Sequence, residues 1–357
     1  KSRENWESIL EDLIKQVSIM KKTYDILVTN PPYMGSKFMN EILSPYMSKK
    51  YKNSKSDLFS AFMEYCFSKV KSNGQLGLLT PYAWMFITTY ENLRKVIVEN
   101  REITTLTQLE YNAFPEACVQ VCTFTIRNYK ANIDGEYIKL SDFKGAENQP
   151  IKVLEAIKNV HVDYRYTANS DNFKNIPGKP IAFWANKRIN DIFKSNRKIS
   201  EISLAKRGLE TGDNNKFLRF WFEVSITNIK FNSSSTEEGK KSNAKWFPYN
   251  KGGGFRRWYG NNELVVNFYN DGEEIRKSGN VTGYDSYFKE GITWSGLTAG
   301  LNSFRYSKPG FLFDSNKGPM MFPSEKYRWI ILGLTNSKIT QGFLNMLNPT
   351  ISVQNKD

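Results

Sequence analysis

The stretch Tyr24-Asp25-Ile26-Leu27-Val28-Thr29-Asn30-Pro31-Pro32-Tyr33 constrains the fold more than any other part of this 357-residue chain. The branched apolar run from Ile26 to Val28 predicts a buried strand of a parallel sheet. Two prolines end that strand, because proline has no N–H to donate to a neighbouring strand. Asn30 is therefore expected at the carboxyl end of the strand, where open α/β sheets bind their ligands.

The residues after the strand suit the chemistry of an exocyclic amine. The amine of adenine is a poor nucleophile because its lone pair is delocalised into the ring, and two hydrogen-bond acceptors would localise that pair. The side-chain oxygen of Asn30 and the carbonyl oxygen of Pro31 can supply them, and the Pro-Pro turn is rigid. The ring of Tyr33 can stack on the base, a contact worth about 1–3 kcal/mol for other stacked bases. This chemistry needs no strong general base, and His161 is the only histidine. The simpler alternative is a turn that only ends a strand.

The segment from Asp25 to Tyr33 resembles the catalytic motif of amino-group DNA methyltransferases, whose adenine-specific members carry Asn-Pro-Pro-Tyr after such a strand. The closest form is the PglX type, the adenine-specific methyltransferases of BREX phage-defence systems, and large restriction-modification enzymes share the layout. The resemblance implies methyl transfer from S-adenosyl-L-methionine to N6 of an adenine flipped out of double-stranded DNA. It implies catalytic roles for Asn30, Pro31, Pro32 and Tyr33, and cofactor contacts for Asn30 and Pro32.

Two later segments extend the resemblance. Ser56-Asp57-Leu58-Phe59 opens a helix expected to run to about Lys69 and to end by Gly74, with Ser56 or Asp57 as its cap and a buried strand over residues 75–80. In the family, the positions of Leu58 and Phe59 lie near the methyl donor, whereas the alternative is a plain βαβ unit. The loop from Asn112 to Val119 matches the family's late motif, which implies that Phe114 stacks on the other face of the adenine. A buried loop phenylalanine is the alternative there.

The rest of the first half reads as an α/β protein. An amphipathic helix is predicted from Trp6 to Val17, a further helix over residues 90–99, and strands over residues 103–109 and 119–127. Residues 34–55 and 233–241 read as polar loops, the second of them mobile. Helices are expected at residues 151–160 and 181–193.

Positive charge is concentrated in the second half of the chain. The whole chain has a formal net charge of +14, but residues 1–150 carry 19 Lys and Arg against 17 Asp and Glu, a net +2. The remainder carries 31 against 19, a net +12. Such a balance indicates a polyanionic partner for the second half.

Basic, aromatic and glycine residues alternate in that half, and as a series they resemble the target-recognition domain of PglX-type enzymes. A triple glycine beside Lys251 lets backbone N–H groups approach a phosphate, and arginines can fork onto phosphates or guanine edges. Each stretch alone is most often only a loop. The residues expected to contact DNA are Arg207, Thr211, Asn214, Arg219, Lys251, Gly252, Gly253, Arg256, Arg257, Trp258, Trp294 and Arg305.

The Gly-rich turn that normally holds the methyl donor is missing from the sequence. In the family it precedes the Asn-Pro-Pro-Tyr strand, and residues 1–23 contain no glycine. The sequence therefore predicts a fragment: the later half of a Rossmann-like methyltransferase sheet, completed by a preceding N-terminal part of the same polypeptide, and then an α+β target-recognition domain. The expected boundaries are a catalytic domain at residues 1–145, a helical connector at 146–200 and the recognition domain at 201–357.

Other features limit the location and the partners. Cys66, Cys118 and Cys122 are too few and too apolar in context for a disulfide framework or a metal site, so buried thiols are expected. No signal peptide and no long apolar run are present, which favours a cytoplasmic protein without a membrane partner. Other phage-defence proteins are possible partners. Two alternatives stay open, a DNA-binding fragment without activity of its own and a methyltransferase of an RNA or protein amine or amide.

Overall fold

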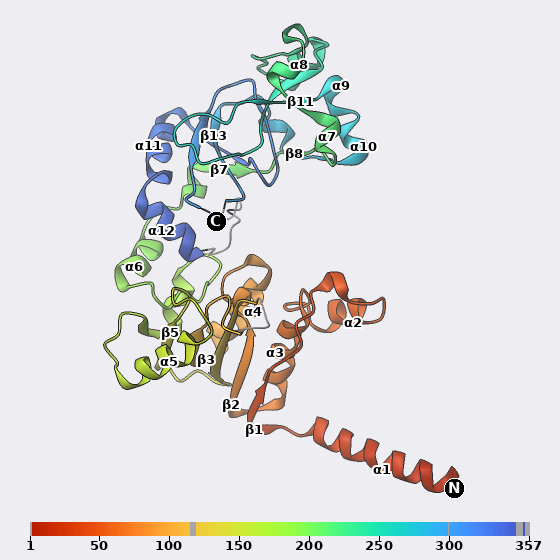
Figure 1. Cartoon of the computed structure of the whole chain (residues 1–357), viewed down its shortest axis with the longest axis vertical. Coiled ribbons are helices and arrows are strands. Elements are labelled where there is room, and N and C mark those ends of the chain that lie inside the picture. Colours follow the sequence, from red (N-terminus) through yellow and green to blue (C-terminus); the bar gives the residue numbers. More distant parts are fainter. Residues whose placement is uncertain (1, 115–118, 299, 348–352, 354–357) are drawn as a thin grey trace. The chain divides into compact units, whose positions relative to one another are not determined.

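The fold is that of a computed structural model that describes residues 2–114, 119–298, 300–347 and 353, without the side chains of residues 2–8. The chain divides into two compact units, Lys1–Ser195 and Asn196–Asp357. Both units mix helices and strands, so the fold is of the mixed α/β kind (Figure 1). In the part that the structure describes, no helix is long and apolar enough to cross a membrane.

In the first unit, helices alternate along the sequence with the strands of one sheet. Its helices are α1 Ser2–Lys21, α2 Leu43–Lys50, α3 Leu58–Lys69, α4 Glu91–Asn100, α5 Asn148–Lys158 and α6 Lys187–Ser195. Its strands are β1 Tyr24–Thr29, β2 Val70–Pro81, β3 Glu102–Gln108, β4 Val121–Arg127, β5 Asp134–Lys139 and β6 Arg165–Asn169.

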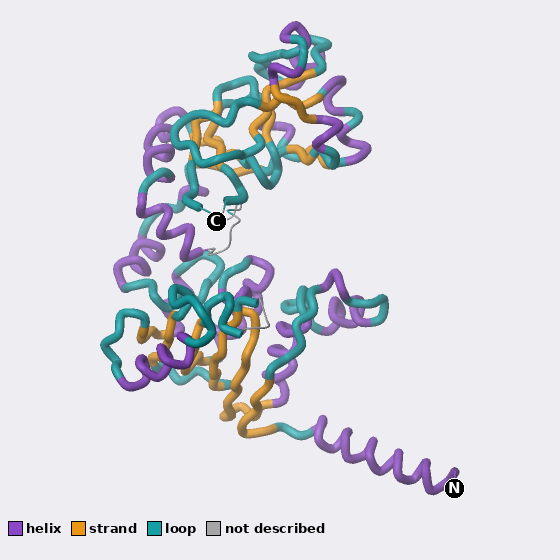
Figure 2. The backbone as a smooth tube through the Cα atoms, in the orientation of Figure 1, coloured by secondary structure: helices purple, strands orange, loops and turns teal. Residues whose placement is uncertain are grey.

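The strands described in this unit form a single sheet in the order β1-β2-β4-β3-β5-β6. Figure 2 draws these strands in orange. β1 pairs with β2 in parallel and β3 with β5 in parallel, whereas β4 runs antiparallel to both β2 and β3. The carboxyl ends of β1, β2 and β3 therefore lie at the same edge of the sheet. The residues that follow these three strands are brought to that edge.

β1 is a parallel strand as predicted, but the expectation that it is buried is wrong. It lies at the end of the described sheet, and Ile26 and Val28 are 70% and 76% exposed, whereas Leu27 packs against the core. Successive side chains of a strand point to opposite faces. One face of β1 is covered by the core of the unit, and among the described residues nothing buries the other face.

The core of the first unit joins the sheet to α3 and α4. Phe59 and Met63 of α3, with Leu93 and Ile97 of α4, pack against residues of β2, β3 and β4. The same cluster contains Phe173, Ile181 and Phe183 from the later part of the unit. Arg94, 1% exposed, donates hydrogen bonds to the carbonyl oxygens of Trp84, Ile87 and Gly178. Residues 173–183 are thereby attached to the first unit.

The second unit is built from short elements. Its helices are α7 Asn214–Phe217, α8 Thr236–Lys241, α9 Tyr269–Gly272, α10 Ile275–Ser278, α11 Glu325–Thr335 and α12 Lys338–Leu347. Its strands are β7 Ser203–Lys206, β8 Leu209–Glu210, β9 Leu218–Phe220, β10 Trp246–Asn250, β11 Leu264–Asn267, β12 Asn280–Val281, β13 Gly291–Trp294, β14 Phe304–Ser307, β15 Leu312–Phe313 and β16 Met320–Pro323.

Two four-stranded sheets organise the described part of the second unit. Their orders are β15-β10-β11-β9 and β14-β13-β16-β7, and β8 pairs with β12. The first sheet packs with α10 around an aromatic cluster that includes Phe247, Phe268, Phe288 and Phe313. The second sheet packs against α11 and α12.

Several local predictions from the sequence are wrong. Residues 34–55 contain α2, and residues 233–241 contain α8, whose cap is the Ser235 hydroxyl that accepts from the N–H of Glu238 at 3.1 Å. The helix expected at residues 181–193 begins only at Lys187. Gly74 does not end a helix but lies inside β2, where an added Cβ would come within 2.6 Å of the Asp25 carbonyl oxygen. The close approach of β1 at this point explains why the position carries glycine.

Candidate functional site

The residues from Asn30 to Tyr33 leave β1 at the carboxyl edge of the sheet. Pro31 is buried, whereas Asn30, Pro32 and Tyr33 are at the surface. The hydroxyl of Tyr33 lies 3.1 Å from the Asn30 side-chain oxygen and 3.2 Å from the Leu79 carbonyl oxygen of β2, and these two acceptors share its single proton. The turn therefore bridges two neighbouring strand ends.

Tyr33 lies over the aromatic part of the core. Its ring meets Phe59 edge to face, with 6.2 Å between the ring centroids, and Phe59 in turn contacts Tyr90 at 5.5 Å. Partial burial, with a smaller contribution from Cys122, raises the pKa of Tyr33. The hydroxyl thus stays protonated at neutral pH and remains a hydrogen-bond donor to Asn30.

Asp57 connects the motif to the beginning of α3. One oxygen of its carboxylate accepts from the N–H groups of Met34 at 3.0 Å and Phe59 at 3.2 Å, so it caps the helix as expected. The N–H of Leu58 donates to the carbonyl oxygen of Met34 at 3.0 Å. Of the two residues expected near the methyl donor, Leu58 is half-buried beside the motif and Phe59 is buried beneath Tyr33.

Phe114 belongs to the loop between β3 and β4, which begins at the same sheet edge as Asn30. Its side chain is 42% exposed rather than buried in the loop. The loop is shaped by Glu110, whose carboxylate accepts from the N–H of Asn112 at 2.7 Å. Residues 115–118 of the late motif, Cys118 among them, lie outside the described residues.

Several residues expected to contact DNA are instead buried in the second unit. Thr211 donates to the Asn214 side-chain oxygen at 2.6 Å, and Trp294 donates from its indole to the Val353 carbonyl oxygen at 3.2 Å. Arg305, 1% exposed, donates to Ser303 and Ser295, and burial lowers its pKa to about 10. These side chains hold loops together, so they do not belong to the proposed DNA surface.

The environment of Lys251 also differs from that of a phosphate contact. Its ammonium nitrogen lies 2.5 Å from the buried Asp314 carboxylate and 3.1 Å from the Asn214 side-chain oxygen. The hydroxyl of Tyr249 donates to the same carboxylate at 2.9 Å. The charge of Lys251 is therefore matched inside the unit. Gly252 is buried as well, and an added Cβ would collide with the Lys317 carbonyl oxygen.

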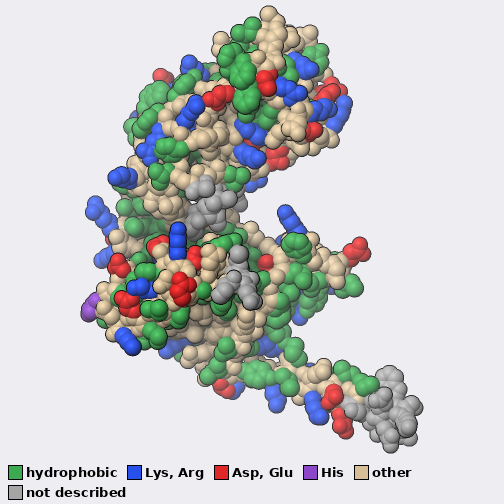
Figure 3. Space-filling model, viewed as in Figure 1, with side chains coloured by type: hydrophobic (Ala, Val, Ile, Leu, Met, Phe, Trp, Pro, Cys, Tyr) green, Lys and Arg blue, Asp and Glu red, His purple; other side chains and the backbone are tan. Residues whose placement is uncertain are grey.

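The remaining expected contacts lie at or near the surface. Arg207, Asn214, Gly253, Arg256 and Trp258 are exposed, and Arg219 and Arg257 are half-buried. On the face shown in Figure 3, Lys and Arg side chains occur among apolar side chains over the second unit. Three consecutive aromatic residues, Phe220, Trp221 and Phe222, follow Arg219 and are exposed. The sequence pattern did not predict them as DNA contacts. An uninterrupted aromatic run directly after a basic residue is the sequence feature that could have indicated them.

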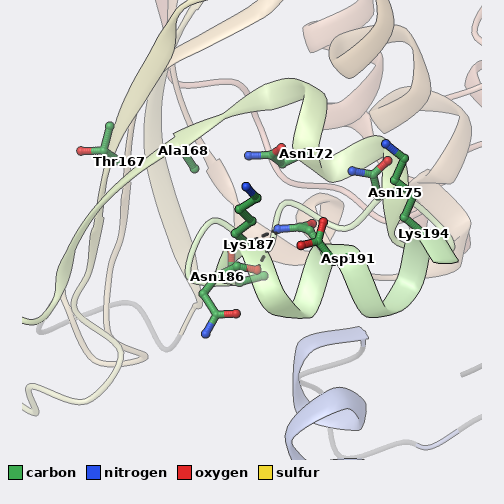
Figure 4. Close-up of a pocket in the computed structure, with 10 residues that line it drawn as sticks. Thr167, Ala168, Asn172, Asn175, Asn186, Lys187, Asp191 and Lys194 are labelled. Carbon is green, nitrogen blue, oxygen red and sulfur yellow. Dashed lines mark hydrogen bonds between the residues drawn. The ribbon is translucent and has the colours of Figure 1, made fainter. Parts of the chain in front are cut away.

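A polar cavity of about 430 Å³ lies in the first unit between the end of β6 and α6 (Figure 4). Lys187 and Lys194 line it together with Asn172, Asn175 and Asp191. The motif residues from Asn30 to Tyr33 do not line this cavity, and no pattern in the sequence indicated it.

No group of three or more His, Cys, Asp or Glu side chains is placed to hold a metal ion among the residues that the structure describes. Cys66 and Cys122 are buried free thiols, in agreement with the sequence. Burial raises the pKa of Cys66 to about 11 and that of Cys122 to about 12.

Comparison with known proteins identifies the class. The profile of the Eco57I restriction-modification methylase family matches residues 1–114. The type IIL restriction-modification enzyme MmeI, solved in complex with DNA, superposes on 93% of this chain and 44% of its own with a TM-score of 0.55 at 11% identity, which indicates a shared fold. The first 114 residues thus match a family of restriction-modification methylases, and most of the chain shares its fold with a restriction-modification enzyme.

Two curated proteins define the type more closely. The adenine-specific methyltransferase PglX of Lacticaseibacillus casei (strain Zhang) is 37% identical over 97% of this chain, and the adenine-specific methyltransferase BrxX of Escherichia coli O9:H4 (strain HS) is 36% identical over 96%. The chain covers 30% and 28% of their lengths. The resemblance to PglX-type adenine-specific methyltransferases is thus confirmed, and the chain is homologous to them along nearly its whole sequence.

Proposed function

We propose that this chain takes part in methyl transfer from S-adenosyl-L-methionine to N6 of a flipped-out adenine in double-stranded DNA, within a phage-defence or restriction-modification system. The observation that carries the proposal is the placement of Asn30 and Tyr33 at the carboxyl ends of β1 and β2. Homology to enzymes named adenine-specific methyltransferases supports the choice of reaction.

Asn30 can act on the amine while it keeps its bond to Tyr33. An amide oxygen has two lone pairs, of which the Tyr33 hydroxyl uses one. The second lone pair and the Pro31 carbonyl oxygen are then the acceptors for the two N–H groups of the amine. Tyr33 and Phe114, both partly exposed, belong to loops that begin at one sheet edge, and in this proposal they stack on the two faces of the base.

In this proposal, the chain supplies only part of the binding site for the methyl donor. The exposed Asn30 and Pro32 and the half-buried Leu58 border the same sheet edge and would hold one side of it. Bound there, S-adenosyl-L-methionine supplies the electrophilic methyl group. The apolar face of β1 at Ile26 and Val28 supports completion of the pocket by a preceding part of the same polypeptide. In this proposal the first unit is the later half of a Rossmann-like sheet.

We assign target recognition to the second unit. This unit, residues 196–357, has 23 Lys and Arg against 15 Asp and Glu, a net charge of +8, which suits contact with the phosphate backbone. Arg207, Arg219, Arg256 and Arg257 remain candidates for contacts to phosphates or bases.

The test is methyl transfer from labelled S-adenosyl-L-methionine by the complete polypeptide that carries this chain. Duplex DNA, duplex RNA and a protein mixture serve as acceptors. Asn30→Ala should abolish transfer to DNA while DNA binding is unchanged, whereas the same substitution at the exposed Asn100 of α4 should leave transfer intact. Full transfer by Asn30→Ala would reject the assigned role, and labelling of RNA or protein alone would reject the DNA substrate.

A further inference from the structure

Two segments of the second unit expose aromatic side chains. The first, the aromatic turn, comprises Phe220, Trp221 and Phe222, which are 45%, 44% and 64% exposed. The second, the glycine loop, comprises residues 252–261 and exposes Phe255, Trp258 and Tyr259. Exposed aromatic clusters of this kind mark interaction sites on soluble proteins.

Glu263 connects the two segments. Its carbonyl oxygen accepts from the N–H of Trp221 at 2.9 Å, and its carboxylate pairs with Arg256 at 2.9 Å. Phe220 lies opposite Leu264 in the β9–β11 pair. Glu263, directly before β11, therefore contacts both the aromatic turn and the glycine loop, and the two segments are neighbours in space.

The backbone of the glycine loop is strained and firmly held. Trp258 has a φ of 74°, a conformation that bulky residues rarely adopt, and Asn261 has a φ of 60°. The Trp258 N–H donates to the Phe304 carbonyl oxygen at 3.0 Å, and its own carbonyl accepts from the N–H of Tyr306 at 2.8 Å. Such strain persists only where surrounding contacts impose it, and it concentrates at functional sites. Here the two backbone hydrogen bonds hold a large aromatic residue, Trp258, at the surface.

Positive charge accompanies the exposed rings. Arg257 lies over the ring of Phe255 at 5.3 Å and Lys308 over the ring of Tyr259 at 5.4 Å. The Nε of Arg257 is buried without a hydrogen-bond partner in the described structure. Rings interleaved with cations suit a polyanion that carries flat apolar groups, which is the chemistry of nucleic acid.

We propose that the aromatic turn and the glycine loop form one surface that stacks on bases of double-stranded DNA at a locally unstacked step. Trp258 and Phe222 supply the stacking contacts, and Arg256 and Arg257 contact the adjacent phosphates. The inference rests on the proposed function, because it specifies how the second unit engages DNA. It adds the aromatic turn, which the sequence pattern did not single out, to the recognition surface.

The experiment measures binding of the 357-residue chain to two labelled duplexes by fluorescence anisotropy. The duplexes share one sequence, and one of them carries a single mismatch that leaves a step unstacked. The unmodified chain should prefer the mismatched duplex. Trp258→Leu and Phe222→Leu should each weaken binding about tenfold and remove that preference. The control is Trp329→Leu, which removes a similarly exposed tryptophan on α11, outside both segments, and should bind like the unmodified chain.

Each outcome decides the proposal. Equal binding by the Trp258→Leu and Phe222→Leu variants and the unmodified chain would overturn the stacking surface while DNA binding itself stands. A lack of mismatch preference in the unmodified chain would also overturn it. No binding of the unmodified chain to either duplex would reject the proposed recognition function of the second unit as well. If thermal melting shows that Trp258→Leu is unfolded, Phe222→Leu decides alone, since it lies in the other segment.

Discussion

At the scale of single residues, the candidate site depends on the hydrogen bond between Tyr33 and Asn30. The hydroxyl of Tyr33 fixes the direction of the Asn30 amide and ties it to the backbone of β2 through Leu79. A free asparagine at a strand end would sample several rotamers, whereas this one is held with its oxygen toward Tyr33. The Asn30 side chain is thus oriented by contacts within the chain itself.

The first prediction concerns this bond. Tyr33→Phe keeps the ring for stacking and removes the donor to Asn30 and Leu79, so the free energy of unfolding should fall by about 0.5–1.5 kcal/mol. Methyl transfer by the complete polypeptide should fall while DNA affinity is kept. Urea denaturation and initial rates measure the two effects. The same substitution at Tyr111, which is 47% exposed in the β3–β4 loop, is the control for loss of a hydroxyl.

A second prediction concerns the buried charge of the recognition unit. Asp314 accepts from Lys251, Tyr249 and the backbone N–H groups of Asn316 and Lys317. Asp314→Ala would leave the Lys251 charge without its buried partner, which costs about 3–5 kcal/mol.

Asp285 provides the control for Asp314. It pairs with Lys206 but is mostly exposed, so Asp285→Ala should cost at most about 1 kcal/mol. Chemical denaturation of both variants compares the two losses. Equal losses would show that the Lys251–Asp314 pair is not a buried structural contact.

At the scale of elements, α3 and the motif depend on one cap. The Asp57 carboxylate accepts hydrogen bonds from the N–H of Phe59 in the first turn of α3 and from the N–H of Met34. Asp57→Ala should therefore lower the free energy of unfolding by about 1–2 kcal/mol, and Asp57→Asn, which retains an acceptor oxygen, by a few tenths. The comparison is made by urea denaturation. An equal loss for both variants would show that the cap is not the cause.

Patterning predicted most elements that surround the site. The strand at Tyr24–Thr29 and the helix capped by Asp57 follow from local apolar periodicity and capping chemistry, which act within a few residues. The exposure of Ile26 and Val28 depends on what packs against that face of β1, which the local apolar run does not encode. Arg305 and Trp294 are buried by tertiary contacts, which a basic, aromatic composition does not encode.

At the scale of the whole molecule, positive charge is concentrated in the second half of the sequence, at residues 151–357, and part of it lies in the last 45 residues of the first unit. The nearly neutral first half carries the motif, and the basic second half carries the candidate DNA surface. Binding of the chain to duplex DNA should weaken steeply as salt rises, with a linear dependence of log affinity on log salt. Fluorescence anisotropy across a salt series measures this dependence. Equal binding of polyglutamate would show that the charge does not select nucleic acid.

In the proposed function, this sequence belongs to the machinery that methylates N6 of adenine in DNA. The most direct measurement is mass spectrometry of nucleosides from duplex DNA incubated with S-adenosyl-L-methionine and the complete polypeptide. We expect N6-methyladenine, and its absence when the polypeptide carries Asn30→Ala. Methylcytosine as the product, or N6-methyladenine formed equally by the Asn30→Ala variant, would contradict the proposed function.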